Sequence, residues 1–383
     1  MKIAAITTSQ VPSSTANSIQ AMKACHALAQ VSGAPLRLWV PGSAPEAWAV
    51  LARHYGLEHP FEIHWLPAGR GWRRYDFAWW AVRQAQQWSA ELVYTWTLQA
   101  AVLALWRGLP VILELHDLPT GRVGPWLFSQ FLRSRTRRRL LVITQALRQK
   151  LEDRYLLSLL PEEAQIAPNG CDLARYADLP EPAAARRQLG LPDGLTAVYS
   201  GHFYAGRGAD LLVGLAESFP QVNFLWVGGR LPDMAFWNAR LLQRGIHNVT
   251  LTGFVENQSL PLYQAAGEIL LMPYGKVIAG SSGGNSAEIC SPMKMFDYLA
   301  TGHAILASDL PVLREVLNPA NAVFCPPEEL PSWKAALEEL IADPERRQSL
   351  GAQARQDAAR YDWRERARRA LEGYDRNYAH DFD

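Results

Sequence analysis

Short apolar runs alternate along the chain with longer segments whose apolar positions recur at helical spacing. In the first half, this pattern predicts strands at residues 2–7, 36–40, 62–66, 92–96, 110–116 and 140–144. Between them it predicts helices that include residues 16–30, 77–90 and 98–107. Buried strands alternating with helices are typical of βαβ units and parallel sheets.

The same pattern restarts after a segment at residues 165–172 that contains a proline and an Asn-Gly turn. Six more strands are predicted at residues 196–201, 223–229, 249–255, 268–274, 303–308 and 321–326. We therefore predict an α/β protein with two Rossmann-like, doubly wound domains facing a cleft, at residues 1–172 and 173–360. Ligands of such sheets bind beyond the carboxyl ends of the strands.

The last segment, residues 361–383, begins as a charged amphipathic helix. Its apolar side chains are expected to pack back across the junction onto the first domain: Trp363, Ala367, Ala370, Leu371 and Tyr374.

Composition narrows the class of protein. Of the 383 residues, 49% are hydrophobic and 20% charged, as in globular proteins. The four cysteines have no CxxC spacing, which favours free thiols in a reducing compartment over disulfides or zinc. There is no signal-peptide pattern and no apolar run of membrane-spanning length. These features predict a cytoplasmic protein.

The two halves of the chain differ in charge. Residues 1–170 contain 18 Lys and Arg against 11 Asp and Glu, a balance of +7, whereas the rest has 20 against 26, a balance of −6. Ten of the 14 tryptophans also lie in the first half. This asymmetry either reflects different partners for the two halves or is drift in surface composition.

Part of the positive charge of the first half is concentrated in residues 128–141. This segment contains Arg133, Arg137, Arg138 and Arg139 beside several aromatic residues. Such a segment fits an anionic membrane surface or an anionic acceptor, while the alternative is a solvated helix face. We do not predict nucleic-acid binding.

A glycine-rich turn follows the first strand of the second domain, in "YSGHFYAGRGADLL". Gly206 and Gly208 flank Arg207 just before a helix, where backbone N–H groups and a guanidinium can bind phosphate. His202 is a second candidate donor. The alternative is a purely structural left-handed turn.

The stretch "SPMKMFDYLATG" predicts a helix that follows the glycine-rich run 280–288. Ser291 is the expected N-cap, Pro292 the first helical residue and Gly302 the end. The expected apolar face consists of Met293, Phe296 and Ala300. Lys294 and Asp297 could serve a diphosphate and ribose hydroxyls, or form a surface ion pair.

His116 ends a predicted strand in "VILELHDLP". At that edge of the sheet an imidazole can donate to a sugar hydroxyl or phosphate, or act in acid–base chemistry. A purely structural histidine is the alternative.

Taken in order, these segments resemble the retaining glycosyltransferases of the GT-B fold, in particular glycosyltransferase family 4. The similar segments are "TANSIQAMKACHALAQ", "PVILELHD", "IAPNGCDLARY", "YSGHFYAGRGADLL", "LTGFVENQSLPLYQAAGEILLMPY", "SPMKMFDYLATGHAILASDLP" and "YDWRERARRALEGY". The resemblance implies a UDP- or GDP-linked sugar bound mainly by the second domain and a glycan or lipid-linked acceptor bound mainly by the first. It implies no cofactor and no metal.

The resemblance also assigns roles to residues. Asp297 takes the place of the acid that binds the ribose, and Arg207 that of the diphosphate lysine. His116 would lie over the transferred sugar, and Asn17 belongs to the acceptor side. The rest of the implied donor site is Gly201, His202, Phe254, Val255, Ser291, Pro292, Met293 and Lys294.

This sequence departs from the family pattern at three positions. Asp297 stands where the family has glutamate, which shortens the reach to the ribose. His202 stands where the family usually has arginine. The first of the paired acids would fall at Ile289, so the neighbouring Glu288 is the candidate for that catalytic role.

We therefore expect a metal-independent hexosyltransferase in cell-surface glycan or glycolipid synthesis, peripheral to the inner membrane face. A sugar-nucleotide epimerase of the same fold and a non-catalytic nucleotide-sugar-binding subunit are the alternatives.

Overall fold

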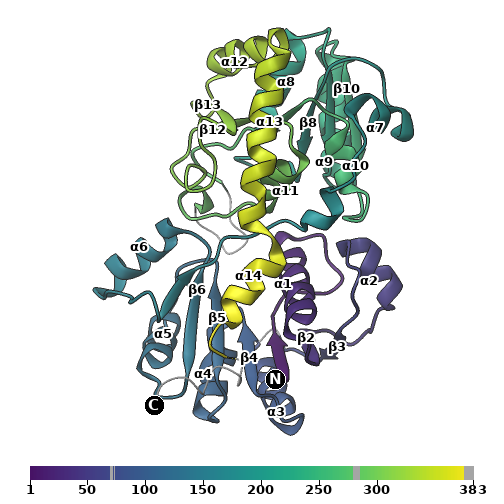
Figure 1. Ribbon diagram of the computed structural model, residues 1–383. Coiled ribbons are helices and arrows are strands. Elements are labelled where there is room, and N and C mark those ends of the chain that lie inside the picture. The colour runs from purple at the N-terminus through teal and green to yellow at the C-terminus, as the bar shows by residue number, and fades with distance from the viewer. Residues whose placement is uncertain (70–71, 73, 279–284, 375–383) are drawn as a thin grey trace. The chain divides into compact units, whose positions relative to one another are not determined.

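The computed structural model describes residues 1–69, 72, 74–278 and 285–374. It divides into two compact units (Figure 1). Unit 1 is Met1–Asn169 with the segment that begins at Trp363, and unit 2 is Gly170–Asp362. The chain therefore passes between the units twice, after Asn169 and after Asp362. The domain boundaries expected from the sequence, at 172/173 and 360/361, lie within a few residues of these positions.

Among the described residues, unit 1 contains a seven-stranded sheet in the order β3-β2-β1-β4-β5-β6-β7, and every pair in it is parallel. The strands are β1 (Ile3–Ile6), β2 (Leu36–Pro41), β3 (Glu62–Leu66), β4 (Leu92–Thr95), β5 (Val111–Leu115), β6 (Arg138–Val142) and β7 (Ala164–Ile166). The helices are α1 (Ala16–Ser32), α2 (Trp48–Tyr55), α3 (Tyr75–Gln87), α4 (Leu98–Trp106), α5 (Gly124–Arg133), α6 (Gln145–Tyr155) and α14 (Trp363–Leu371).

Unit 2 repeats the architecture with a six-stranded parallel sheet in its described part, in the order β10-β9-β8-β11-β12-β13. Its strands are β8 (Thr196–Ser200), β9 (Asn223–Val227), β10 (Val249–Gly253), β11 (Ile269–Met272), β12 (Ala304–Ser308) and β13 (Ala322–Cys325). Its helices are α7 (Pro182–Leu189), α8 (Ala209–Ser218), α9 (Leu231–Gln243), α10 (Leu260–Ala265), α11 (Met293–Thr301), α12 (Leu330–Ala342) and α13 (Pro344–Ala358), with short 3₁₀ turns η1 (Leu173–Tyr176), η2 (Ser286–Glu288) and η3 (Ala359–Tyr361).

The expected Rossmann-like α/β fold is thus confirmed in both units. All twelve predicted strands are present; most are fully or largely buried apolar runs, whereas the edge strands β3 and β10 are only partly buried. β7 was missed, since its sequence Ala-Gln-Ile is short and half polar and carries no strand pattern.

Two glycines shape the turn between β8 and α8. Gly206 and Gly208 have φ angles of +80° and +76°. A Cβ on Gly206 would lie 1.9 Å from the carbonyl oxygen of Val277, and one on Gly208 would lie 1.9 Å from that of Pro273. Both positions therefore require glycine, and the tight turn fixes Arg207 between them.

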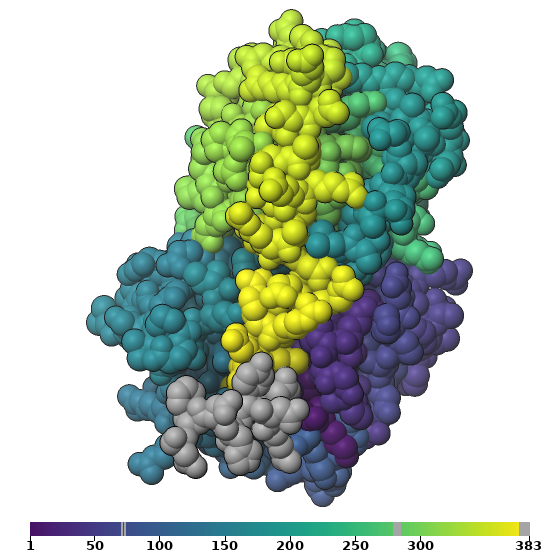
Figure 2. Space-filling view, viewed as in Figure 1, coloured from purple at the N-terminus to yellow at the C-terminus, as the bar shows by residue number. Residues whose placement is uncertain are grey.

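The C-terminal helix α14 belongs to unit 1, where it packs against α1; Figure 2 shows its yellow surface beside the purple N-terminal segment. All five apolar side chains predicted for this packing are buried: Trp363, Ala367, Ala370, Leu371 and Tyr374. Residues 375–383 of the predicted crossover segment lie outside the described residues. No helix in the described residues has the length and apolarity needed to cross a membrane.

Candidate functional site

Unit 2 gathers two cations and two tyrosines where β8 and β11 end. The guanidinium carbon of Arg207 lies 4.8 Å from the centre of the Tyr274 ring. The Nζ of Lys294 lies 5.3 Å from the centre of the same ring and 3.9 Å from that of Tyr199. Both tyrosines are fully buried. The aromatic faces thus hold two positive groups close together, as cation–π contacts do.

Lys294 is placed unusually for an ammonium group. Its Nζ is buried and has no hydrogen-bond partner among the residues that the structure describes. Burial and then the charge of Arg207 hold the pKa of Lys294 well below its usual range. An amine that has lost water without gaining a partner carries a desolvation cost, which an anionic ligand would relieve.

The Lys294 amine lies against the end of β8. Gly201 has a φ of +142°, and a Cβ there would come within 2.6 Å of the Lys294 Nζ. The alternative interpretation, a surface ion pair of Lys294 with Asp297, is therefore wrong, because the lysine side chain turns toward Gly201 and the tyrosines instead.

Arg207 is fixed by its surroundings. The pKa of Arg207 is raised, chiefly by the Tyr274 hydroxyl, against an opposing effect of burial. Burial in turn raises the pKa of Tyr274 to about 12, so the tyrosine stays protonated at neutral pH. Tyr199 donates its hydroxyl to the carbonyl of His202 at 2.6 Å, which anchors the start of the turn.

Asp297 lies elsewhere on α11. Its carboxylate is close to the hydroxyl of Tyr176, whose pKa is raised by burial and then by the Asp297 charge. Tyr176 itself is buried and donates to Oε1 of Gln264 at 2.9 Å. Asp297 is partly exposed, so this arrangement orients the carboxylate while leaving it accessible.

The remaining candidate donor residues of unit 2 occupy loops at strand ends. The His202 ring stacks on Tyr204 with centroids 4.9 Å apart. Phe254 follows β10 and is 45% exposed, whereas Val255 packs against the core.

The start of α11 differs from the prediction by one residue. Pro292, not Ser291, is the N-cap, and it makes no side-chain capping bond, while Ser291 is buried before the helix. Met293 is not part of the buried face, which consists of Met295, Phe296, Tyr298, Leu299, Ala300 and Thr301. Gly302 ends the helix in the left-handed conformation, as predicted.

Glu288 and Ile289, the two positions considered for the candidate acid, differ in exposure. Glu288 is exposed at the end of η2, and Ile289 is buried. Most of the glycine-rich run before them, residues 280–284, lies outside the described residues.

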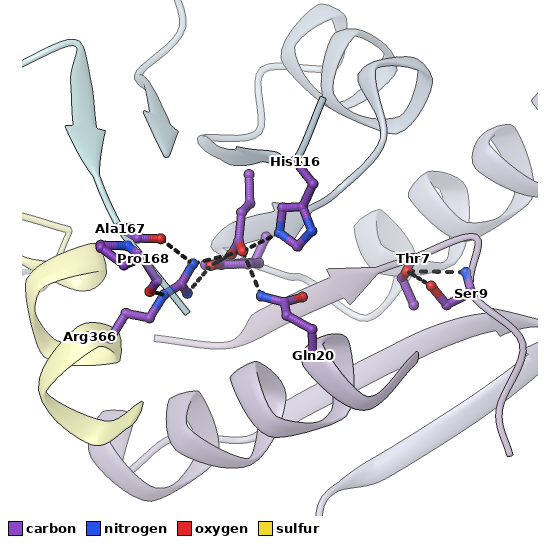
Figure 3. Close-up of polar contacts among 9 residues, drawn as sticks. Thr7, Ser9, Gln20, His116, Ala167, Pro168 and Arg366 are labelled. Carbon is purple, nitrogen blue, oxygen red and sulfur yellow. Dashed lines mark hydrogen bonds and ion pairs between the residues drawn. The ribbon is translucent and has the colours of Figure 1, made fainter. Parts of the chain in front are cut away.

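Unit 1 contains a buried charged cluster around Glu114 (Figure 3). The Glu114 carboxylate is fully buried at the end of β5. Its Oε1 accepts from Gln20 at 2.6 Å and pairs with Arg366 at 2.7 Å, and its Oε2 accepts from the Tyr94 hydroxyl. Burial raises the pKa of Glu114, but Arg366 and His116 outweigh it and lower the pKa to about 2. The cluster is therefore charged at neutral pH.

His116 is held by this carboxylate. Its Nε2 lies 2.7 Å from Oε1 of Glu114, and its side chain is 24% exposed. Because Glu114 is ionised, Nε2 carries the proton that it donates, and Nδ1 is left on the other side of the ring. The imidazole can thus meet a ligand in one fixed orientation.

The basic segment 128–141 is not one helix face. It divides between α5 and β6, and three of its arginines donate to carbonyl groups. Arg137 donates to Gly373, Arg138 to Leu132 and Ser134, and Arg139 to Ala370 and Glu372 at 2.8 Å each. These guanidinium groups thus satisfy backbone carbonyls at the end of α5 and around α14. Arg133 is exposed in the last turn of α5, and Asn17 is exposed in the first turn of α1.

Sequence reasoning missed four of the residues that build these clusters: Tyr199, Tyr274, Glu114 and Arg366. A signal was present for two of them. Glu114 interrupts an otherwise apolar strand two residues before His116, and Arg366 falls on the apolar side of its helix. A charged side chain at a buried position needs a partner of opposite charge, so the sequence could have suggested that Glu114 and Arg366 pair.

Comparison with known proteins places both halves of the chain. Residues 20–175 match Glycosyltransferase Family 4, and residues 207–372 match the Glycosyl transferase-like family. HepE from Anabaena, solved in complex with UDP, superposes with a TM-score of 0.73 over 97% of this chain and 99% of its own, at 17% identity. The chain belongs to the GT-B glycosyltransferases.

Two characterised relatives are more similar in sequence. A phosphatidyl-myo-inositol mannosyltransferase from Mycolicibacterium smegmatis is 25% identical over 66% of this chain and 62% of its own length. A D-inositol 3-phosphate glycosyltransferase from Kineococcus radiotolerans is 25% identical over 85% of this chain and 72% of its own. The match to the first of these glycosyltransferases thus spans less than two thirds of that relative.

Proposed function

We propose that this glycosyltransferase moves a hexose-type sugar from a nucleoside diphosphate sugar to an acceptor hydroxyl, with retention at the anomeric carbon. The observation that carries the proposal is the pair of basic side chains at the end of β8, Arg207 and Lys294, whose Nζ is buried and has no hydrogen-bond partner among the described residues. Two positive groups beside a glycine turn match the charge of a diphosphate.

The chemistry follows from charge. The bond between the anomeric carbon and the diphosphate oxygen breaks, the acceptor oxygen bonds to that carbon, and the acceptor proton passes to the leaving phosphate. Negative charge grows on the diphosphate, where Arg207 and Lys294 would stabilise it more strongly than in the ground state. With these two cations in place we propose that no metal and no cofactor is required.

The relatives support the choice of donor and acceptor classes. HepE was solved with UDP and with UDP-glucose, which supports a UDP-linked donor, with a GDP-linked donor as the other candidate. The names of the two relatives are those of enzymes that glycosylate an inositol phospholipid and an inositol phosphate. We propose a glycan or lipid-linked acceptor, and a site of action at the inner membrane face in glycolipid or cell-surface glycan synthesis.

Within the proposed site, Asp297 would accept hydrogen bonds from the ribose and Phe254 would border the base. Gly201, Ser291, Pro292 and Met293 would bring backbone groups to the donor. His116 would accept a hydrogen bond from a hydroxyl of the transferred sugar through Nδ1, because its Nε2 proton is engaged by Glu114. Glu288 remains the candidate acid.

The test is release of nucleoside diphosphate from a panel of nucleotide sugars. A donor at about 100 times its dissociation constant should add roughly 2.7 kcal/mol of stability, so a thermal-shift screen identifies it first. Release should then fall by about 100-fold or more in Arg207→Ala. Arg240→Ala, which removes an arginine paired with Asp210 on the surface, is the matched control. A chelator should leave the rate unchanged.

Two outcomes would replace the proposal. Conversion of the bound sugar nucleotide to its epimer without an acceptor would make the protein an isomerase. Tight binding without release across many acceptors would make it a binding subunit, which His202 and Ile289 favour.

A further inference from the structure

Four of the exposed tryptophans of unit 1 lie on adjoining helices and have no part in the proposed function. Trp79 and Trp80 lie on α3, Trp106 ends α4, and Trp126 lies in the first turn of α5; they are 37%, 47%, 60% and 50% exposed. α3 contacts α4 and α4 contacts α5, so the three helices form one surface (Figure 1). Exposing one large aromatic is ordinary, but four on adjoining helices mark an interaction site.

The rings are linked to one another and to cations. Trp79 and Trp80 meet edge to face with centroids 4.6 Å apart, as do Trp106 and Trp126 at 6.1 Å. The guanidinium carbon of Arg83 lies 5.3 Å and 5.5 Å from the Trp79 and Trp80 centroids. That of Arg107, next to Trp106, lies 5.9 Å from the Trp79 centroid, which joins the two pairs. We call these six residues the Trp–Arg face.

The charge of this surface is mainly positive. Across α3, α4, α5 and Arg107, the sequence contains three arginines, Arg83, Arg107 and Arg133, and a single acid, Asp76. Asp76 is already engaged, because its Oδ2 accepts from the backbone N–H of Gly69 at 2.7 Å. These helices with Arg107 thus carry three arginines against one acid, so the surface is aromatic with an excess of positive charge.

We infer that the Trp–Arg face is a docking surface for the interface of an anionic lipid bilayer. Indole rings favour the region between headgroups and acyl chains, because one edge is apolar and the N–H can hydrogen-bond. Arginines beside them bind lipid phosphates and gain from the negative surface potential.

The ring geometry argues for lipid over sugar stacking. A sugar-binding platform needs an exposed ring face, whereas guanidinium groups lie over Trp79 and Trp80 and the paired rings are steeply inclined, at 79° and 66°. Partly exposed rings with guanidinium groups over them suit a headgroup layer better than a stacked sugar. This inference extends the proposed function by giving the enzyme its means of reaching a membrane-borne acceptor.

Co-sedimentation with phosphatidylcholine vesicles, with and without phosphatidylglycerol, tests it directly. The protein should bind the anionic vesicles, with binding weakened by salt, and brominated lipids should quench its tryptophan emission. Trp80→Ser with Trp126→Ser should lower the partition coefficient about tenfold. Arg83→Gln should lower it about fivefold on anionic vesicles and leave binding to neutral vesicles unchanged.

Matched controls come from unit 2. Phe236 and Leu242 are 59% and 66% exposed on α9, so Phe236→Ser with Leu242→Ser removes as much exposed apolar surface elsewhere. These controls should bind vesicles as the unaltered protein does. Circular dichroism and thermal unfolding check that each variant folds, and if the double tryptophan variant does not, Trp126→Ser with Arg83→Gln replaces it.

Three results would overturn the inference. They are absence of binding at low salt, equal losses in the control, or a concentration-dependent dimer that Trp80→Ser with Trp126→Ser abolishes, which would make the face a protein interface. Release of nucleoside diphosphate does not need vesicles. Failure of vesicle binding therefore leaves the proposed transferase activity standing, and the reverse also holds.

Discussion

Arg366, on the C-terminal helix, pairs at 2.7 Å with Glu114 at the end of a central strand of unit 1. The same guanidinium donates to the carbonyls of Ala167 and Pro168 at 3.0 Å and 2.7 Å, just before the first passage of the chain into unit 2 (Figure 3). Glu114 in turn holds His116. A single buried cation thus connects the returning helix, the departing chain and the candidate sugar-binding histidine.

Removing one member of this pair should be costly. In Glu114→Gln, Arg366 stays buried without a counter-charge, and unit 1 should lose about 3–5 kcal/mol. Replacing both, as Glu114→Gln with Arg366→Met, should recover much of that loss, because no charge is then left buried. Hydrogen exchange of peptides covering β5 and α14 measures the change.

The exposed pair of Arg314 and Asp309 is the control. Its side chains are 43% and 42% exposed, so Asp309→Asn should cost less than about 1 kcal/mol. Equal losses in Glu114→Gln and Asp309→Asn would contradict this account of the buried pair.

Lowering the pH should reduce the stability of unit 1 by protonating the Glu114 carboxylate. The pKa of Glu114 is lowered to about 2 from the usual 4.5, so its ionised form favours the folded state. That stabilisation is complete above the unfolded pKa and is lost as the pH falls from about 4.5 toward about 2, amounting to roughly 3 kcal/mol. Urea unfolding between these pH values should show the slope in the unaltered protein and a smaller slope in Glu114→Gln.

Lys294→Met should have opposite effects on stability and binding. Without ligand, the amine is buried and unpartnered among the described residues, so a thioether that keeps contact with Tyr199 should raise the melting temperature. The nucleotide should then bind about tenfold more weakly or worse, because a charge-assisted hydrogen bond is lost. Calorimetric titration with UDP and GDP measures the second effect.

Measuring nucleotide affinity against pH, in the unaltered protein and in Lys294→Met, separates the effect of the Lys294 charge from the effect of its shape. The pKa of Lys294 lies well below its usual range without ligand, and a bound diphosphate would raise it. Affinity should therefore decline as the pH rises through the lowered pKa, with a proton taken up on binding. This decline should be smaller in Lys294→Met, and an identical decline in both proteins would exclude Lys294 as its source.

The elements and several strand-end residues followed from the sequence, because each depends on local pattern. The spacing of apolar residues predicts strands and helices, and the glycines at 206 and 208 predict the turn that fixes Arg207. The clusters did not follow, because their members are far apart in the chain. Nothing near Lys294 indicates that Tyr199 and Tyr274 will cover it.

The helix at residues 293–301 shows the limit most clearly. One of the two interpretations of the spacing paired Lys294 with Asp297, whereas in the fold Lys294 contacts Tyr199 and Asp297 lies near Tyr176. Contacts with other elements outweighed an i,i+3 pair worth only about 0.2–0.5 kcal/mol. In the basic segment, too, Arg137 and Arg139 donate to carbonyls around α14, which are distant in sequence, whereas its predicted role as a membrane or acceptor patch stays a prediction.

Gly201→Ala tests the contact between the end of β8 and Lys294. A Cβ there would lie 2.6 Å from Nζ, so the lysine must move away from the turn. Gly245 also has a positive φ, +66°, but nothing lies within 4 Å of its added Cβ. Gly245→Ala therefore introduces a left-handed alanine without displacing any side chain.

Both variants should lose some stability, but only Gly201→Ala should weaken nucleotide binding. In Lys294→Met, which already lacks the amine, Gly201→Ala should reduce affinity much less than it does in the unaltered protein. Equal reductions in both backgrounds would show that Gly201 acts independently of Lys294.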